Sequence, residues 1–471
     1  MQTKIKASRR SLGMNYAIRE VTVPAAQAAA AGKKLLCLNI GDPNKWDFET
    51  PEYFKATLRA AVDEVDNGYG DSQGEPDLRN AIVEREYQKN GIHISSSDVY
   101  VTAGVSECIN MLMGTFIEPG DEILVPGPGY PSYAQYINFY EGQTVPYRMI
   151  EEEDWRPDVD MIRKRITDST KAMILINPNN PTGAGYDEKD LREIGDIAAE
   201  YGIPIISDEI YDKIVFDGEF YSMSKLPSDV PRIILNGFSK VNLMPGWRVG
   251  YCYFMDEAGL MDDIRTGFMK QMRARICPNV PCQAAARASL QGPQDYIVEM
   301  NRKLKERADF TYKRLNEIDG ISTRKAKGAL YMFPHIDLSG TPWKNDYGFV
   351  HDLIMEEGVV LVHGSGFCEE FGQDHFRTIL LAPQPVLEEA YDKMESFLKR
   401  HRQRTLFAAD TRFTLCQRSA SAMVPAVSVL DTSYYDWLKY PSSSRFHPMP
   451  FLMMIHHQID AGLMKIIDFN G

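Results

Sequence analysis

Two reactive side chains stand at the ends of apolar segments. Lys240 closes RIILNGFSK, and Asp208 closes IPIISD. A lysine amine that is partly neutral can form a Schiff base with a carbonyl compound. A carboxylate in a similar place can hold a pyridinium nitrogen protonated, so that the ring withdraws electrons from a bound amino acid. Taken singly, a solvated lysine and an aspartate that caps a helix are the more common alternatives.

Three more side chains could surround a planar ring held by those two groups. Tyr211 follows Asp208 by three residues, so one helical turn would bring its hydroxyl to the same side as a donor to a phenolic oxygen. Asn180 lies in NPNNPTG, whose two prolines restrict the backbone and would fix its amide. Tyr130 in PGPGYPSY could stack on the ring, although most aromatic residues at loop edges simply pack.

A phosphate could be bound close to the same place. The loop AGVS at 103–106 joins an expected strand to an expected helix. The free amides at the start of a helix, together with its dipole, favour a phosphate group. Arg248 follows Lys240 by eight residues and could supply a matching cation in bidentate fashion.

The elements that must position these residues alternate along the chain. The short runs DVYVTAG, DEILVPGPGY, KAMILINP, IPIISDEIY and RIILNGFSK are separated by amphipathic segments such as DEKDLREIGDIAAEYG. This alternation predicts an α/β fold with a mostly parallel sheet covered on both faces. In such sheets ligands bind beyond the carboxyl ends of the strands, and the loops there hold nearly all the residues named above.

The pattern also divides the chain into four parts. We expect an N-terminal segment at 1–45 that packs with a small domain, and a large domain at 46–293. The small α+β domain at 294–404 would begin with a polar-faced helix and contain GALYMFPHI, GVVLVHG and FRTILLA. Residues 405–471 contain no glutamate and follow neither the strand nor the helix period, so we expect an irregular tail there.

Composition excludes several classes of protein. The 471 residues include 65 acidic and 52 basic side chains, and the net charge of −13 argues against nucleic-acid binding. No apolar run approaches the about 18 residues of a membrane span. Seven scattered cysteines without a C-x-x-C pair indicate reduced thiols in a cytoplasmic protein. His447, His456 and His457 lack partners at metal-ligand spacing, so no metal site is expected.

The first twenty residues, MQTKIKASRRSLGMNYAIRE, are basic. They weakly resemble a transit peptide but contain no apolar core and no small-residue cleavage site. We therefore expect an unprocessed N-terminus.

Four motifs in chain order carry a resemblance to a known family. The run NPNNPTG, SDEIYD, GFSK and PGWRVGY resembles the class I and II aminotransferases, which are fold type I pyridoxal-phosphate enzymes. The resemblance extends from about Ala7 to about Arg400. It implies pyridoxal 5′-phosphate bound in the 46–293 domain, an amino acid and a 2-oxo acid as substrates, and a homodimer.

The resemblance also assigns roles to individual residues. Lys240 would be the Schiff-base lysine and the acid and base that moves a proton from the amino acid Cα to the cofactor C4′. Asp208 would pair with the pyridine nitrogen, Asn180 and Tyr211 would hold the phenolic oxygen, and Tyr130 would stack on the ring. The phosphate ligands would be the amides of Gly104, Val105 and Ser106, with Ser239, Arg248 and, from the neighbouring subunit, Tyr69 in YGDSQGEPDLR.

For the substrate, Arg377 in HFRTILLAP would bind the α-carboxylate, with Gly41 in NIGDP and the amide of Asn180 nearby. One position departs from the family pattern. Gly237 stands where many members have a serine, so the phosphate would lose one hydroxyl ligand.

The segments NYAIREV, LNIGDP and NGFSK are more similar to the alanine (glutamate–pyruvate) aminotransferase branch. This similarity favours alanine and 2-oxoglutarate as substrates. In that branch Tyr16 and Arg19 lie in a segment that folds over the substrate, so Arg19 is a candidate for holding a side-chain carboxylate. A plain surface arginine is an equally common interpretation.

Three other functions compete with transamination. A β-eliminating C–S lyase of the same fold would use the same residues and differ in how Lys240 and the substrate bonds are oriented. A non-catalytic sensor that keeps the cofactor pocket usually carries a DNA-binding domain, and the acidic charge disfavours it. A nicotinamide enzyme would rest only on VPGPGYP, which is not a G-x-G-x-x-G motif.

Overall fold

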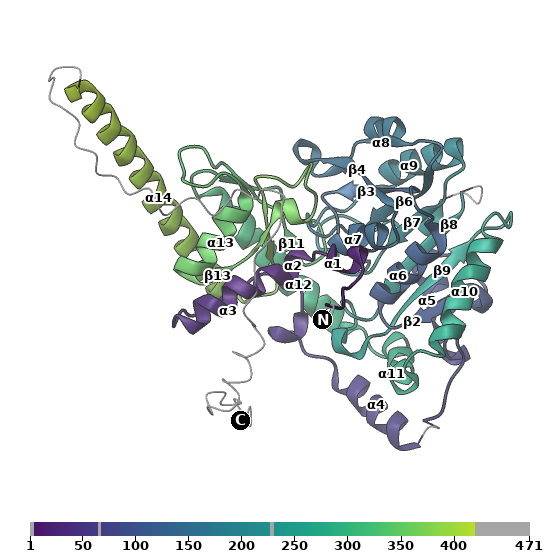
Figure 1. The fold of residues 1–471 in the computed structure, drawn as a ribbon. Coiled ribbons are helices and arrows are strands. Elements are labelled where there is room, and N and C mark those ends of the chain that lie inside the picture. Colours follow the sequence, from purple (N-terminus) through teal and green to yellow (C-terminus); the bar gives the residue numbers. More distant parts are fainter. Residues whose placement is uncertain (1–3, 65–66, 227–229, 420–471) are drawn as a thin grey trace. The chain divides into compact units, whose positions relative to one another are not determined.

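A computed structural model describes residues 4–64, 67–226 and 230–419 of the chain (Figure 1). The chain divides into two compact units, Met1–Asp410 and Thr411–Gly471. The second unit is described only over 411–419, which form the end of the last helix. Everything that follows about the site concerns the first unit.

Eight strands form one sheet in the spatial order β2-β9-β8-β7-β6-β3-β4-β5 (Figure 1). Neighbouring strands from β8 through β7, β6 and β3 to β4 are all parallel, whereas β9 and β5 run antiparallel to their neighbours. The predicted mostly parallel sheet is therefore confirmed. The strands are β2 Val99–Thr102, β3 Glu122–Gly127, β4 Gln143–Ile150, β5 Arg156–Pro157, β6 Thr170–Ile176, β7 Ile205–Asp208, β8 Arg232–Gly237 and β9 Gly250–Met255.

Both faces of the sheet are buried, which explains why its strands are continuous apolar runs. In β6, Ile174 and Ile176 point into one hydrophobic cluster, and Met173 and Leu175 into the other. The first cluster includes helices α6 Val105–Phe116, α7 Pro131–Phe139 and α10 Asp262–Arg275, and the second includes α5 Pro76–Asn90, α8 Val159–Arg165 and α9 Glu188–Tyr201. Helix α11 Val280–Gln291 packs against α4 Glu52–Glu64 and α5.

Local signals in the sequence set the ends of these helices. Helix α9 begins after Asp187, whose carboxylate accepts a hydrogen bond from the amide of Asp190 at 2.9 Å. It ends at Gly202, which has φ +65° and so takes the left-handed conformation that closes a helix. The crossover from β6 to β7 therefore returns the chain to the same edge of the sheet.

The parallel register brings the carboxyl ends of the central strands together. Ile176 at the end of β6 pairs with Asp208 at the end of β7, and Asp208 pairs with Leu235 near the end of β8. The loops that follow these strands therefore open at one edge, where ligands bind in folds of this type.

Smaller sheets and long helices follow the large sheet in the chain. Helix α12 Asp295–Asn316 matches the helix expected from residue 294. The sheets are β10 Ile321–Ser322 with β12 His335–Ile336, and β11 Tyr331–Met332, β15 Phe376–Ile379 and β14 Val362–His363 in that spatial order. Strand β13 Val359–Val360 pairs with β1 Leu36–Cys37, and helix α13 Asp346–Glu357 lies against α3 Thr22–Ala30.

The N-terminal segment thus contacts this later part of the chain, and it also holds the short helices α1 Arg9–Leu12 and α2 Ala17–Glu20. The domain boundaries at residues 45, 293 and 404 remain predictions. Helix α14 Gln384–Ser419 continues through the last of them, over residues where the sequence shows no helical period. The run TLFAADTRFTLCQRS contains neither glycine nor proline, so nothing in it breaks the helix. The rest of the expected tail, 420–471, lies outside the described residues.

Candidate active site

A cavity of about 450 Å³ lies at the carboxyl edge of the sheet. Its walls come from the strand-end loops, from the N-terminal segment and from strands β11 and β15. Thirteen of the residues predicted to form a site line it: Tyr16, Arg19, Gly41, Val105, Ser106, Tyr130, Asn180, Asp208, Tyr211, Ser239, Lys240, Arg248 and Arg377.

Lys240 reaches this cavity from the end of β8. Its Nζ donates a hydrogen bond to the backbone oxygen of Gly41 at 2.6 Å. A Cβ atom on Gly41 would lie 2.1 Å from the hydroxyl oxygen of Tyr331, so only glycine fits at this position. The close approach of the backbone lets Gly41 accept the lysine amine, which places the nucleophile beside the N-terminal segment.

Asp208 is a buried carboxylate aimed into the same cavity. Its Oδ2 accepts a hydrogen bond from the hydroxyl of Tyr133 at 2.9 Å, and its Oδ1 accepts one from the amide of Ile210 at 3.2 Å. Burial raises the pKa of Asp208 to about 6, although both hydrogen bonds and the charge of Lys240 act in the opposite direction. A cationic partner for this carboxylate would therefore be strongly favoured.

Tyr211 reaches the cavity as expected, but from a turn and not from a helix. Backbone hydrogen bonds from Asp212 to Glu209 and from Ile214 to Tyr211 form that turn directly after β7. The Tyr211 hydroxyl lies 3.0 Å from the hydroxyl of Tyr331, with either oxygen able to donate. Glu209 and Asp212 explain the difference, because their contacts on the opposite side hold the segment as a turn.

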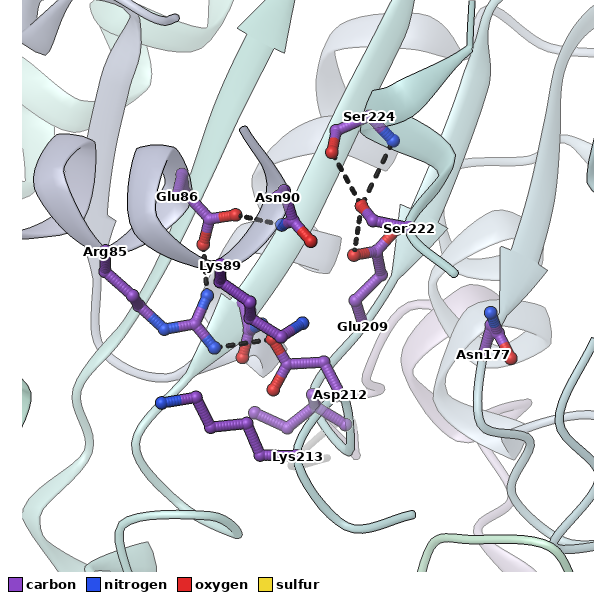
Figure 2. A network of polar contacts seen from close by, with 12 residues as sticks. Arg85, Glu86, Lys89, Asn90, Asn177, Glu209, Asp212, Lys213, Ser222 and Ser224 are labelled. Carbon is purple, nitrogen blue, oxygen red and sulfur yellow. Dashed lines mark hydrogen bonds and ion pairs between the residues drawn. The ribbon is translucent and has the colours of Figure 1, made fainter. Parts of the chain in front are cut away.

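These contacts on the opposite side form a buried charge network (Figure 2). The carboxylate of Asp212 accepts hydrogen bonds from Arg85, from Lys89 at 2.8 Å and from Asn236 at 2.9 Å. Burial alone would raise the pKa of Asp212, but the cations of Arg85 and Lys89 outweigh it and the pKa is lowered. Glu209 accepts the hydroxyl of Ser222 at 2.7 Å. These contacts of Asp212 and Glu209 hold the segment that carries Asp208 and Tyr211 from the side opposite to the cavity.

Arg377 is a buried cation in β15, with 1% of its surface exposed. It donates from Nη1 to the side-chain oxygen of Asn180 at 3.0 Å and from Nη2 to the backbone oxygen of Asn39. Its Nε has no hydrogen-bond partner, and no carboxylate of the described residues forms an ion pair with it. A buried guanidinium without an anion is costly, so this position suits a carboxylate ligand.

The other end of the cavity contains the start of helix α6. Gly104 precedes the helix with φ +77°, and a Cβ atom there would lie 2.4 Å from the Nη2 of Arg248. Arg248 itself donates to the backbone oxygens of Pro245 at 2.9 Å and of Ala103 at 3.4 Å. The helix amides and the guanidinium therefore face the same space, as an anion site requires.

Two tyrosines close a further side of the cavity. The hydroxyl of Tyr16 lies 3.0 Å from that of Tyr130, which precedes helix α7. Burial raises the pKa of Tyr130, so its hydroxyl stays protonated near neutral pH. Arg19 lines the cavity from an exposed position in α2.

The structure does not bring Tyr69 into this cavity. Its side chain is 85% exposed, and it is absent from the lining residues of the chain's own site. The predicted role of Tyr69 requires a neighbouring subunit, so it stays a prediction.

Two site residues escaped the sequence analysis. Tyr133 stands three residues after Tyr130 in PGPGYPSY, so helical spacing on the first turn of α7 could have indicated it. Tyr331 in GALYMFPHI carries no such signal, because it lies more than a hundred residues from its partner Tyr211. Only the tertiary structure brings the hydroxyls of Tyr211 and Tyr331 together.

Other negative findings concern the described residues alone. In the ranges 4–64, 67–226 and 230–419, no cluster of three or more His, Cys, Asp or Glu side chains is placed to hold a metal ion. His447, His456 and His457 lie outside those ranges. Among the helices that the structure describes, none has the length and apolar character to cross a membrane.

The fold and the cavity define an α/β enzyme whose site opens at the carboxyl edge of a mostly parallel sheet. Residues 33–394 match the family model described as aminotransferase class I and II. The chain belongs to this aminotransferase family, and the resemblance seen in the four motifs is confirmed.

Similar proteins agree with this assignment. The glutamate-pyruvate aminotransferase of Haemophilus influenzae is 37% identical over 376 residues, which are 79% of this chain and 92% of that protein. An aromatic-amino-acid aminotransferase of Thermococcus litoralis is 36% identical over 370 residues, which are 78% and 92% of the two chains. The solved structure of an alanine aminotransferase from Pyrococcus furiosus has a TM-score of 0.82 and 53% identity, and covers 84% of this chain and 100% of its own.

Proposed function

We propose that this aminotransferase uses pyridoxal 5′-phosphate to move the amino group of alanine to 2-oxoglutarate, as a cytoplasmic homodimer. One observation carries the proposal: the amine of Lys240, the buried carboxylate of Asp208 and the unpaired guanidinium of Arg377 line a single cavity. This is the set of charges that a cationic ring nitrogen, a carbonyl carbon and a substrate carboxylate would require. Proteins named alanine or glutamate-pyruvate aminotransferase among the relatives support the choice of substrates.

The residues present fit the cofactor. Asp208 is buried and its raised pKa would return toward its ordinary value beside a protonated ring nitrogen. The α6 amides with Ser106, Ser239 and Arg248 surround the place for a phosphate. When bound, pyridoxal phosphate supplies an electron-withdrawing ring that stabilises negative charge at the substrate Cα. Tyr130 would contact the ring face, and Tyr211 with Asn180 would donate to its phenolic oxygen.

The chain's own residues would then do two further things. Arg377 would bind the substrate α-carboxylate through its free Nε, with Asn180 keeping the guanidinium in place. The Nζ of Lys240 would remove the proton from Cα, as a base held close to the substrate by the oxygen of Gly41. Arg19 at the rim of the cavity would take the second carboxylate of 2-oxoglutarate, and Tyr16 would lie over the substrate.

The dimer would complete the phosphate site. Tyr69 is exposed on one chain, and we propose that its hydroxyl reaches the phosphate site of the neighbouring subunit. Burial of this ring against a partner would add apolar contact area to the interface.

The test is the visible absorption spectrum of the cofactor-loaded protein. We expect a band of lysine-bound cofactor that L-alanine alone removes and 2-oxoglutarate restores. Lys240→Ala should lack this band and lose at least about a thousandfold in turnover, because nucleophile and base are removed together.

Lys213→Ala is the matched control. Lys213 is half-buried and lies outside the cavity, and burial lowers its pKa. If the band came from any lysine with a lowered pKa, Lys213→Ala would lose it and Lys240→Ala would keep it. Release of pyruvate and ammonia from a cysteine-like donor, without any 2-oxo acid, would identify a C–S lyase. An unchanged spectrum of Lys240→Ala would refute the proposed role of this lysine.

A further inference from the structure

Tyr331 contacts three functional groups of the site at once. Its hydroxyl lies 3.0 Å from that of Tyr211, and its ring lies under the guanidinium of Arg377, 4.4 Å from the centroid. The same hydroxyl lies where a Cβ atom on Gly41 would be 2.1 Å from it, and the backbone oxygen of Gly41 accepts the amine of Lys240. Only 3% of the side chain is exposed, so these contacts are shielded from water.

Neighbouring strands fix the position of this side chain. Tyr331 begins β11 and pairs with Ile379 of β15, the strand that carries Arg377. The rings of Tyr331 and Tyr211 meet edge to face at 87°, with centroids 5.8 Å apart. The contact between their hydroxyls therefore joins the small sheet to the turn after β7.

We propose that Tyr331 is a positioning residue whose hydroxyl donates to the oxygen of Tyr211 and thereby directs the Tyr211 proton into the cavity. Tyr211 is then free to donate to the phenolic oxygen of the cofactor. This inference rests on the proposed function and deepens it, because it assigns one direction to a hydrogen bond that either tyrosine could donate.

The charges around the pair support this direction. Tyr211, Lys240, Arg377 and Asp42 are the charged and titratable groups that act on Tyr331. Burial would raise the pKa of Tyr331, but Lys240, Arg377 and the hydrogen bond with Tyr211 outweigh it and the pKa is lowered. Burial and the neighbouring phenol raise the pKa of Tyr211. The guanidinium of Arg377 over the Tyr331 ring makes the Tyr331 hydroxyl the more acidic of the two, and on this ground we assign it as the donor to Tyr211.

The experiment is a pH titration of the visible band of the cofactor-loaded protein, monitored without substrate. A hydrogen bond from Tyr211 favours the ionised phenolic oxygen, so its weakening raises the midpoint. We expect Tyr331→Phe to raise the midpoint by about half to one pH unit, the effect of a single hydrogen bond. Tyr147→Phe is the control, because its hydroxyl donates to the oxygen of Ile174 at 2.8 Å and does not line the cavity.

A double substitution separates positioning from a general loss of packing. Tyr211→Phe should raise the midpoint at least as much as Tyr331→Phe, and adding Tyr331→Phe to it should cause no further change. A wild-type midpoint in Tyr331→Phe, or two effects that simply add, would overturn the inference. If Tyr331→Phe fails to fold, Tyr211→Phe still tests the same hydrogen bond. A wild-type midpoint in Tyr211→Phe would also overturn the inference.

These outcomes differ from a failure of the proposed function. If the wild-type protein has no band that depends on Lys240, the function itself is wrong and this inference fails with it. If the band depends on Lys240 but its pH midpoint is unchanged in Tyr331→Phe, only the inference fails.

Discussion

At the scale of single residues, the site contains two buried charges, Asp208 and Arg377, that form no ion pair within the described residues. Asp208 is buried with two neutral donors, and Arg377 is buried with two neutral acceptors and an unpaired Nε. Each costs free energy in the ligand-free protein, and each would be compensated by a ligand of the opposite sign. The two buried charges therefore favour the binding of a zwitterionic substrate and a cationic ring.

Asp208 makes a prediction about stability and pH. Its pKa in the folded protein is about 6 against an ordinary 3.8, so the folded state loses stability as the pH rises through this interval. In the cofactor-free protein, Asp208→Asn should therefore raise the free energy of unfolding above pH 6, by at most about 3 kcal/mol, with little effect near pH 4. Urea unfolding at pH 4 and pH 8 measures this difference.

The loaded protein should behave in the opposite way. A cationic ring nitrogen beside Asp208 would stabilise the wild type more than Asp208→Asn, so cofactor binding should shrink or reverse the difference. A stability gain that does not change with pH would show that desolvation of this carboxylate is not its origin.

At the scale of elements, the segment 208–212, which is the end of β7 and the turn after it, is held from two sides. Asp208 and Tyr211 face the cavity, and Glu209 and Asp212 face the charge network under helix α5 (Figure 2). The sequence DEIYD contains both sets of residues, but the contact that turns Asp212 away from the cavity is made with Arg85, which lies 127 positions away in the chain. The network therefore positions the site without entering it.

Removal of the Asp212 carboxylate should lower the stability of the protein. Asp212→Ala leaves Lys89 without its anion and Arg85 with Glu86 alone, so we expect a loss of about 3 kcal/mol in the free energy of unfolding. Asp77→Ala, which breaks an exposed ion pair with Arg287, is the control and should change little. Equal unfolding midpoints in urea for the two variants would contradict an anchoring role.

At the scale of the whole molecule, the cavity is assembled from segments spread over most of the first unit. Tyr16 and Gly41 come from the N-terminal segment, Lys240 from the large sheet, and Tyr331 and Arg377 from the small one. Pairing of β1 with β13 ties the first of these segments to the last part of the chain. A change at any of these junctions should affect binding and catalysis together.

The proposed dimer can be tested by mixing two inactive variants. A mixed dimer of Lys240→Ala and Tyr69→Ala chains would contain one site with Lys240 from one chain and Tyr69 from the other. Unfolding and refolding an equal mixture should therefore restore about a quarter of the wild-type sites, if chains pair at random. Activity that never exceeds the average of the two variants would show that Tyr69 acts within its own chain or not at all.

The sequence by itself determined the elements and most of the chemistry. Strand and helix periods, caps such as Asp187 and Gly202, and the motifs around Asn180, Asp208 and Lys240 are local, so they can be recognised without coordinates. Their common position also follows from the sequence, because parallel strands end at one edge.

Only the tertiary structure decided the contacts between distant segments. The hydroxyl pair of Tyr211 and Tyr331, the approach of Gly41 to Lys240 and the support of Asp212 by Arg85 each join residues more than a hundred positions apart. No period or spacing encodes such pairs, because they arise from packing whole elements together.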